Sequence, residues 1–321
     1  MPHDFHRPVL ADAVVAWARG PLAEPGEPAR GIYVDVTCGG GGHAARLLDA
    51  LRPRRAVLLD RDPAALHHAR ARLAPFSDRI PLDFIHAPFA QIDAVLDDLD
   101  LAAVDLVLAD LGVSSHQLDT PGRGFSFQAD APLDMRMDPS TGPTAADLVA
   151  EASYEDLVRI LRRYGEEPDA AAIARAIVRT RPTTTGALVR VVESALGPRR
   201  RARRRHLATR TFQALRIAVN RELEQLDALL DRAPGRLAWG GRLLAITYHS
   251  LEDRRVKRCF RRLSAPPRLP RKLPVRSNDR PRPSFVVPRE ARSGVIPEPG
   301  EVAKNPRARS ARLRVLERRC A

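Results

Sequence analysis

The chain has 321 residues, of which 44% are hydrophobic, and this is enough for one large or two ordinary domains with a substantial core. The formal net charge is +14, which favours a polyanionic partner such as nucleic acid, although an arginine-rich genome composition would raise the same count. The three cysteines are isolated, so neither a zinc site nor a disulfide framework is predicted, and free thiols suit the cytoplasm. We expect no signal peptide, and no apolar run approaches the roughly 20 residues of a membrane span.

Strands alternate with helices over the first third of the chain. Residues 9–18 have the apolar spacing of a helix, and residues 20–30 form a linker rich in proline and glycine. Strands are predicted at 31–38, 55–60, 80–85 and 104–109, and helices at 43–51, 63–73 and 90–98. Such alternation is typical of a parallel sheet with helices on both faces, in which ligands bind at the carboxyl ends of the strands.

This pattern stops near residue 125 and resumes late in the chain. A loop at 119–143 is followed by helices at 154–164, 170–180 and 186–196, an arginine run at 199–205 and one long amphipathic helix through 212–230. After a Gly240-Gly241 turn we expect a strand at 242–248, a helix at 251–263, a mostly irregular segment at 264–308 and a last strand at 310–317. We therefore predict an α/β domain made of residues 1–125 and 208–321, with an inserted helical domain at 126–207.

The strongest candidate for a ligand site is the glycine run that follows the first strand. The spacing Gly39-x-Gly41-x-x-Ala44 matches the dinucleotide-binding fingerprint. The spacing Asp35-x-Thr37-x-Gly39-x-Gly41 is also similar to the acidic motif of S-adenosylmethionine (SAM) methyltransferases. Glycine allows a close approach of ligand to main chain, and the following helix start offers free N–H groups. Both ligand classes remain open on this pattern alone.

Three later residues stand where a nucleotide-like ligand would meet the ends of neighbouring strands. Asp60 ends the second strand, where an acidic residue accepts hydrogen bonds from ribose hydroxyls; Asp62 is better placed to cap the next helix. Phe89 could flank an adenine ring or belong to the core. Asp110 leaves the fourth strand at the start of a polar segment, where amino-methyltransferases place the group that accepts a hydrogen bond from the target amine.

Two further features of the sequence could take part in substrate binding: the segment after the late strand and two groups of basic residues. In the segment after the late strand, Ser250 and Asp253 have the spacing of a capping box, and His249 could contact substrate or be structural. The arginine run at 199–205 and the basic residues of 254–262 could neutralise phosphates. Few aromatic residues lie between these charges, so base stacking along an extended strand is not the expected mode.

Eight motifs in order along the chain resemble one family, the bacterial ribosomal RNA small subunit methyltransferase H family of SAM-dependent cytosine-N4 methyltransferases. The motifs are DVTCGGGGH at 35–43, LDRD at 59–62, DLGVSSHQLD at 110–119, RGFSF at 123–127, PLDMRM at 132–137, ATRTFQALR at 208–216, YHSLEDR at 248–254 and NPR at 305–307. The similarity runs from His6 to Glu317. Departures are Leu207, where the family usually has proline, the arginine run at 199–205, and the segment 264–300.

The resemblance implies a class I SAM-methyltransferase (Rossmann-like) sheet with an inserted all-helical domain that recognises substrate. It implies methylation of a cytidine in the decoding centre of 16S rRNA within the small ribosomal subunit, with SAM as methyl donor and no metal. The family's cofactor contacts correspond to Gly41, Gly42, His43, Asp60, Phe89, Asp110 and Gln117, and Asp110 is also the candidate catalytic acceptor. The oligomeric state stays open, a homodimer included.

Two other interpretations remain at this point. An NAD-dependent oxidoreductase would account for the glycines and Asp60, but not for the basic segments or the polar turn after Asp110. A non-catalytic RNA-binding or assembly protein could retain a nucleotide pocket without using it. The intact glycine run, Asp60 and Asp110 favour an enzyme over this second alternative.

Overall fold

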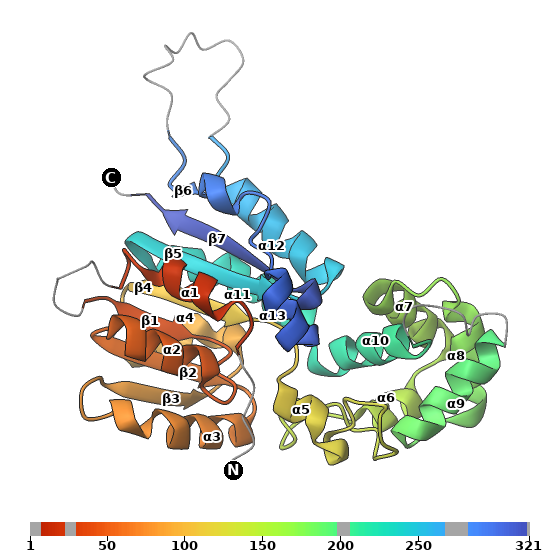
Figure 1. Ribbon diagram of the computed structural model, residues 1–321. Coiled ribbons are helices and arrows are strands. Elements are labelled where there is room, and N and C mark those ends of the chain that lie inside the picture. Colours follow the sequence, from red (N-terminus) through yellow and green to blue (C-terminus); the bar gives the residue numbers. More distant parts are fainter. Residues whose placement is uncertain (1–7, 23–29, 198–205, 267–281, 320–321) are drawn as a thin grey trace, which may run out of the picture. The chain divides into compact units, whose positions relative to one another are not determined.

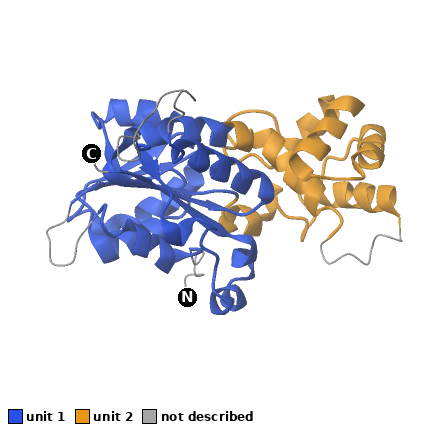
Figure 2. Ribbon diagram, turned by 90° about the horizontal axis from the view of Figure 1, so that it is seen from above, with its two compact units in different colours: residues 1–112, 225–321 blue, residues 113–224 orange. Residues whose placement is uncertain are grey.

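The computed structural model describes residues 8–22, 30–197, 206–266 and 282–319. The chain divides into two compact units: residues 1–112 together with 225–321 form the first unit, and residues 113–224 form the second (Figure 2). The second unit extends beyond the predicted insertion of 126–207 at both ends. Flanking residues such as Phe125, Phe212 and Leu215 are buried in the hydrophobic core of the second unit, so these segments fold with the helices and not with the sheet.

The first unit contains a seven-stranded sheet with the order β3-β2-β1-β4-β5-β7-β6. The strands are β1 (Ile32–Asp35), β2 (Arg55–Asp60), β3 (Leu82–His86), β4 (Val104–Asp110), β5 (Leu237–Thr247), β6 (Phe285–Val286) and β7 (Arg312–Arg318). Strands β1 to β5 are parallel, whereas β7 pairs antiparallel with β5 and with β6. The predicted Rossmann-like sheet is confirmed. The order in which successive strands are added reverses between the parallel strands β1 and β4, and such sheets bind ligands at this point.

Helices cover both faces of this sheet (Figure 1). One face packs on α1 (Ala11–Ala18), α2 (Gly42–Leu51) and α3 (Pro63–Leu73), and the other on α4 (Ile92–Asp98), α11 (Glu222–Arg232) and α12 (Ser250–Leu263). Successive strand residues alternate between the two cores, so Tyr33 joins the first and Val34 the second. Burial on both faces explains why the central strands read as unbroken apolar runs.

The second unit is helical. Its elements are α5 (Ser115–Asp119), α6 (Ala145–Glu151), α7 (Tyr154–Gly165), α8 (Ala170–Thr180), α9 (Thr185–Leu196) and α10 (Thr209–Asn220). Hydroxyl side chains begin four of these helices: Ser114, Thr144, Ser153 and Thr184 each accept a hydrogen bond from a first-turn amide. At Gly165 an added Cβ would lie 2.7 Å from the Arg210 carbonyl oxygen, so only glycine lets α7 approach α10 this closely.

Two expectations need correction. The predicted long helix at 212–230 is two helices, because Arg221 adopts the left-handed conformation (φ 50°) between α10 and α11. Strand β5 begins at Leu237, so Gly240 and Gly241 lie inside it, at an irregularity in its pairing with β4. Within the segment 264–308, expected to be mostly irregular, the described residues include β6 and α13 (Pro299–Lys304). The arginine run at 199–205 lies outside the described residues.

Among the described helices, none combines the length and the apolar character that a bilayer-crossing segment requires.

Candidate functional site

The glycine turn is held to the neighbouring strand and helix by its own backbone. Gly39 and Gly41 have positive φ values of 53° and 76°, and Gly41 precedes the first residue of α2. The Gly39 amide donates a 2.7 Å hydrogen bond to Asp60 Oδ2. A Cβ on Gly41 would meet the Leu73 side chain of α3 at 3.3 Å. Side chains are therefore excluded here by conformation and by helix packing, and the turn is fixed relative to the end of β2.

Three carboxyl groups end three adjacent strands around this turn. Asp35 is the last residue of β1, Asp60 of β2 and Asp110 of β4, and β1 lies between the other two strands in the sheet. Parallel strands bring their carboxyl ends to one edge, so residues far apart in sequence form one acidic cluster. Asp60 and Asp110 were predicted at this edge from the sequence.

Burial raises the pKa values of two of these acids to about 6. Asp35 is 1% exposed; its carboxylate accepts hydrogen bonds from the Tyr33 hydroxyl at 2.7 Å and from the Thr37 amide at 3.2 Å. Asp60 accepts from the amides of Gly39 and Asp62. These hydrogen bonds favour the ionised acids, but the loss of solvation outweighs them in both cases.

Asp110 is held by residues from three other segments. The Tyr248 hydroxyl donates to Asp110 Oδ1 at 2.8 Å, and His43 Nε2 lies 3.4 Å from Oδ2. The Asp110 amide donates to Thr37 Oγ1 at 2.6 Å. Burial, and then the charge of Asp110, raises the pKa of Tyr248 well above its usual value, so the phenol stays protonated and acts as a fixed donor. The acid is oriented before any ligand arrives.

A family model for the MraW methylase family matches residues 3–319 of the chain. The chain belongs to the MraW methylase family. Three relatives, each named ribosomal RNA small subunit methyltransferase H, come from Azoarcus sp. (strain BH72), Halorhodospira halophila (strain DSM 244 / SL1) and Desulfosudis oleivorans (strain DSM 6200 / JCM 39069 / Hxd3). They are 48%, 51% and 44% identical, over 97%, 98% and 98% of this chain and 95%, 94% and 98% of their own. The family resemblance and the class I methyltransferase fold expected from the sequence are confirmed.

The other residues predicted to bind the cofactor lie in different parts of the structure. Gly42 is the first residue of α2, and His43 follows it with a side chain that is 7% exposed. Phe89 starts a short 3₁₀ turn after β3 and packs, half-buried, on the core of the sheet's α4 face. Gln117 lies in the second unit, where its side-chain oxygen accepts a hydrogen bond from the Ser114 amide in a capping box.

The start of α12 differs from the predicted capping box of Ser250 and Asp253. His249 is the residue that precedes the helix, and Glu252 accepts hydrogen bonds from the amides of Tyr248 and His249. Asp253 instead binds the Arg314 guanidinium through two hydrogen bonds of 2.7 and 3.0 Å. His249 Nε2 lies 3.2 Å from Glu252 Oε1, close to the helix start.

The sequence analysis quoted Asp35, Thr37 and Tyr248 only as members of motifs and gave none of them a role in the site. Tyr248 directly follows the last residue of β5, and β5 pairs with β4. A polar residue at that position must lie at the same edge as Asp110 once the strand order is known. Tyr248 could therefore have been found from its position, because it directly follows a parallel strand.

The raised pKa values of Asp35 and Asp60 predict that the stability of the ligand-free methylase increases on mild acidification. In the unfolded chain both groups titrate near 3.8, against about 6 in the folded chain. Between these two pKa values the folded state therefore binds more protons than the unfolded state. The resulting gain in stability is complete below the unfolded pKa and is lost as the pH rises through about 6. Each shift corresponds to about 3 kcal/mol.

Urea denaturation at about pH 7 and about pH 5 would measure this change in the free energy of unfolding. Asp134 and Asp253 have lowered pKa values because each binds an arginine, although burial acts in the opposite sense, so they titrate below the window. In the Asp60→Asn variant the pH dependence should be smaller by the contribution of one group. A wild-type stability that falls steadily from pH 7 to pH 5 would contradict the assignment.

Proposed function

We propose that this methylase transfers a methyl group from SAM to the exocyclic N4 amine of a cytidine in the decoding centre of 16S rRNA. The observation that supports SAM as the methyl donor is the acidic cluster of Asp35, Asp60 and Asp110 around the glycine turn. The name that its relatives share, ribosomal RNA small subunit methyltransferase H, supports a ribosomal RNA substrate of the small subunit. Cytoplasm is the compartment in which a bacterial enzyme would meet this substrate.

The residues at the turn fit SAM in charge and in shape. SAM carries a sulfonium and an ammonium group, which carboxylates attract, whereas the pyrophosphate of NAD would be repelled by the same acids. A Cβ on Gly39 would meet only the Thr37 carbonyl oxygen, at 3.9 Å, so the space above the turn is open. Within the described residues neither buried ring nitrogen of His43 makes a hydrogen bond. Nε2 faces Asp110 at 3.4 Å, so Nδ1 is the nitrogen left for a ligand.

In this proposal each predicted residue has a part in holding the donor. Asp60 accepts hydrogen bonds from the ribose hydroxyls, Phe89 flanks the adenine, and the backbone of Gly41, Gly42 and His43 contacts the methionine part. Asp110 and Gln117 complete the set that the family resemblance implies. Bound SAM supplies an activated methyl group on a sulfonium leaving group, so the proposed transfer requires no metal ion.

The choice between SAM and NAD predicts a direct binding result. Isothermal titration of the folded protein should give saturable heat with SAM and none with NAD under the same conditions, because only SAM complements the acids. Removing two charges at the turn in an Asp35→Asn/Asp60→Asn variant should weaken SAM binding without creating NAD binding. Heat with NAD alone would overturn the cofactor assignment, and so would a folded protein that takes up neither compound.

Asp110 can act on the target amine because of how it is held. Cytosine N4 is a weak nucleophile, since its lone pair is delocalised into the ring. A carboxylate that accepts an amino hydrogen lets the nitrogen pyramidalise as it attacks the methyl group. Tyr248 fixes one Asp110 oxygen and leaves the other available for the amine, which must come from a base extruded from its stack. A backbone carbonyl of residues 111–115 is the alternative acceptor.

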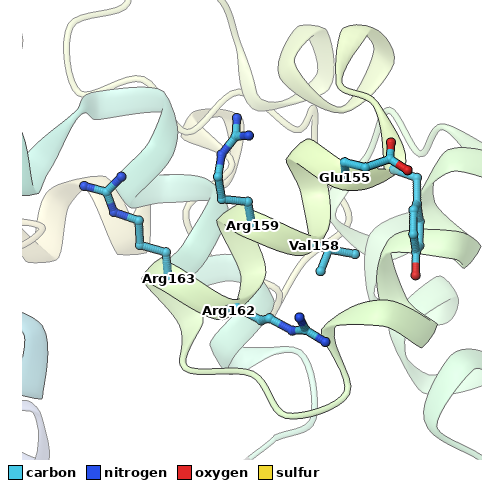
Figure 3. Close-up of a pocket in the computed structure, with 6 residues that line it drawn as sticks. Glu155, Val158, Arg159, Arg162 and Arg163 are labelled. Carbon is cyan, nitrogen blue, oxygen red and sulfur yellow. The ribbon is translucent and has the colours of Figure 1, made fainter.

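The second unit offers a basic surface that suits the recognition of RNA. A shallow cavity of about 540 Å³ runs along α7, and Arg159, Arg162 and Arg163 line it together with Val158 (Figure 3). Asp156 binds the Arg159 guanidinium at 2.5 Å, and Glu224 lies 3.8 Å from that of Arg163. Both pairs are exposed to solvent and therefore weak, so a phosphate can compete with the carboxylates for these arginines. Phosphate contacts to such a surface position an RNA without reading its sequence, which is the role we propose for this unit.

The product itself tests the reaction. Small-subunit rRNA from a strain lacking this enzyme, incubated with the protein and SAM, should gain one methyl group on a single cytidine, mapped by mass spectrometry of nuclease fragments. Tritium transfer from labelled SAM to RNA would exclude the alternative of a non-catalytic RNA-binding protein. Label on another base, or on the carbon C5 of cytosine, would contradict the N4 assignment.

A further inference from the structure

The first unit contains a second cavity, of about 360 Å³, between α12, β6 and β7. Its floor is apolar: Phe260, Ala291 and Val315 are 2%, 1% and 0% exposed and all line it. The cavity lies where the outer edge of β7 is only partly covered. Leu313 is bridged to Val295, and pairing with β6 resumes at Glu317. The backbone of Val315 faces the same side as that of Leu313, so its polar groups point toward this gap.

The rim of the cavity is strongly basic. Lys257 and Arg261 contribute from α12, Arg292 from the segment before β7, and Arg319 from the end of β7. Among the described residues, no carboxylate lies within 4 Å of any of these four cations. A fifth arginine, Arg314, differs because Asp253 binds it through two hydrogen bonds. Its charge is neutralised, whereas the other four are available to an anion.

We propose that this cavity binds a nucleotide of the RNA substrate, with its phosphate among the four rim cations and its base or ribose on the apolar floor. The inference rests on the proposed function in so far as RNA is the substrate. Its volume is at the low end of small-molecule pockets, which suits one nucleotide. RNA alternates anionic phosphates with flat apolar surfaces, and arginine planes stack on bases while binding phosphate. An apolar peptide would leave the rim charges without partners.

Helix α12 links this cavity to the candidate methyl-transfer site. The helix begins at Ser250, two residues after Tyr248, and Arg261 lies eleven residues farther along. At 1.5 Å per residue this separation is about 16 Å along the helix axis. A nucleotide in the cavity would then be a few positions from the extruded base on the same strand. Binding there would hold the RNA near the site without contacting the reacting atoms.

The test compares two double variants that remove equal charge. Lys257→Gln/Arg261→Gln removes two rim cations, whereas the control Arg258→Gln/Arg309→Gln removes two exposed arginines that do not line the cavity. Affinity for a short single-stranded oligoribonucleotide is measured by fluorescence anisotropy at several salt concentrations, with inorganic phosphate as a separate probe. We expect the rim variant to bind the oligoribonucleotide about tenfold more weakly than the control, with a salt slope lower by about 1.

Methyl-transfer kinetics give a second readout. The rim variant should have a raised KM for ribosomal RNA, while kcat and the Kd for SAM match those of the control. Equal loss in the two double variants would overturn the proposal, because net charge alone would then explain binding. Rim-dependent binding of inorganic phosphate without rim-dependent binding of the oligoribonucleotide would overturn it too. Should the rim variant unfold, the single variants Arg292→Gln and Arg319→Gln make the same comparison against Arg309→Gln.

The proposed function can fail separately from this inference. If the wild-type protein transfers no methyl group to RNA, but the oligoribonucleotide still binds through Lys257 and Arg261, the reaction assignment is wrong and the nucleotide site stands. If methyl transfer proceeds normally and the rim variant equals the control, the reaction stands and the nucleotide site is wrong.

Discussion

Replacing Asp110 with alanine is expected to lower kcat for methyl transfer by about 10²- to 10⁴-fold at saturating SAM. The carboxylate is the proposed acceptor for the amine hydrogen, and it is oriented by Tyr248 at 2.8 Å with His43 nearby at 3.4 Å. Without it the nitrogen lone pair stays in the ring. The measurement is single-turnover transfer to small-subunit rRNA, so that product release does not limit the rate. Near-wild-type turnover at saturating SAM would reject a direct role for Asp110.

The Tyr248→Phe variant is the matched control for this prediction. It keeps the Asp110 carboxylate and the aromatic ring but removes the hydroxyl donor. A carboxylate that is present but less well oriented should give a loss well below that of Asp110→Ala. Equal losses in the two variants would mean that Asp110 acts only through the shape of the pocket.

The sheet and the acidic edge could be predicted from the sequence because they depend on local patterns. The residues Asp60 and Asp110 each end an apolar run, and the topology of parallel sheets places such ends together. The break between the two helices at Arg221 could not be predicted. This arginine has a left-handed backbone conformation, and nothing in the residue types around it indicates that the helix ends there. Local patterns also do not show which core Phe125 and Phe212 join, because tertiary packing decides it, and both lie in the core of the helical unit.

The site also stores electrostatic free energy that a ligand can relieve. Asp35 and Asp60 are acids whose ionised forms are disfavoured by burial, and each raises the pKa of neighbouring acidic groups at the turn. A bound cation would lower both pKa values. SAM binding should therefore release protons near pH 6 and weaken as the pH falls through that value, the opposite direction from the stability of the free protein. Because the two pH dependences have opposite signs, measurements can distinguish the effect of these acids on SAM binding from their effect on stability.

Replacing Asp60 with alanine is expected to weaken SAM binding by about 10²- to 10⁴-fold. Two charge-assisted hydrogen bonds to the ribose would be lost, together about 3 to 6 kcal/mol. The glycine turn would also loosen, because Asp60 accepts from the amides of Gly39 and Asp62. Titration calorimetry of the variant measures the loss. Asp62→Ala is the control: it removes the side-chain cap of α3, which accepts from the Ala64 amide at 3.0 Å, so stability should fall while SAM affinity is largely kept. An Asp60→Ala protein that binds SAM as tightly as the wild type would show that the ribose lies elsewhere.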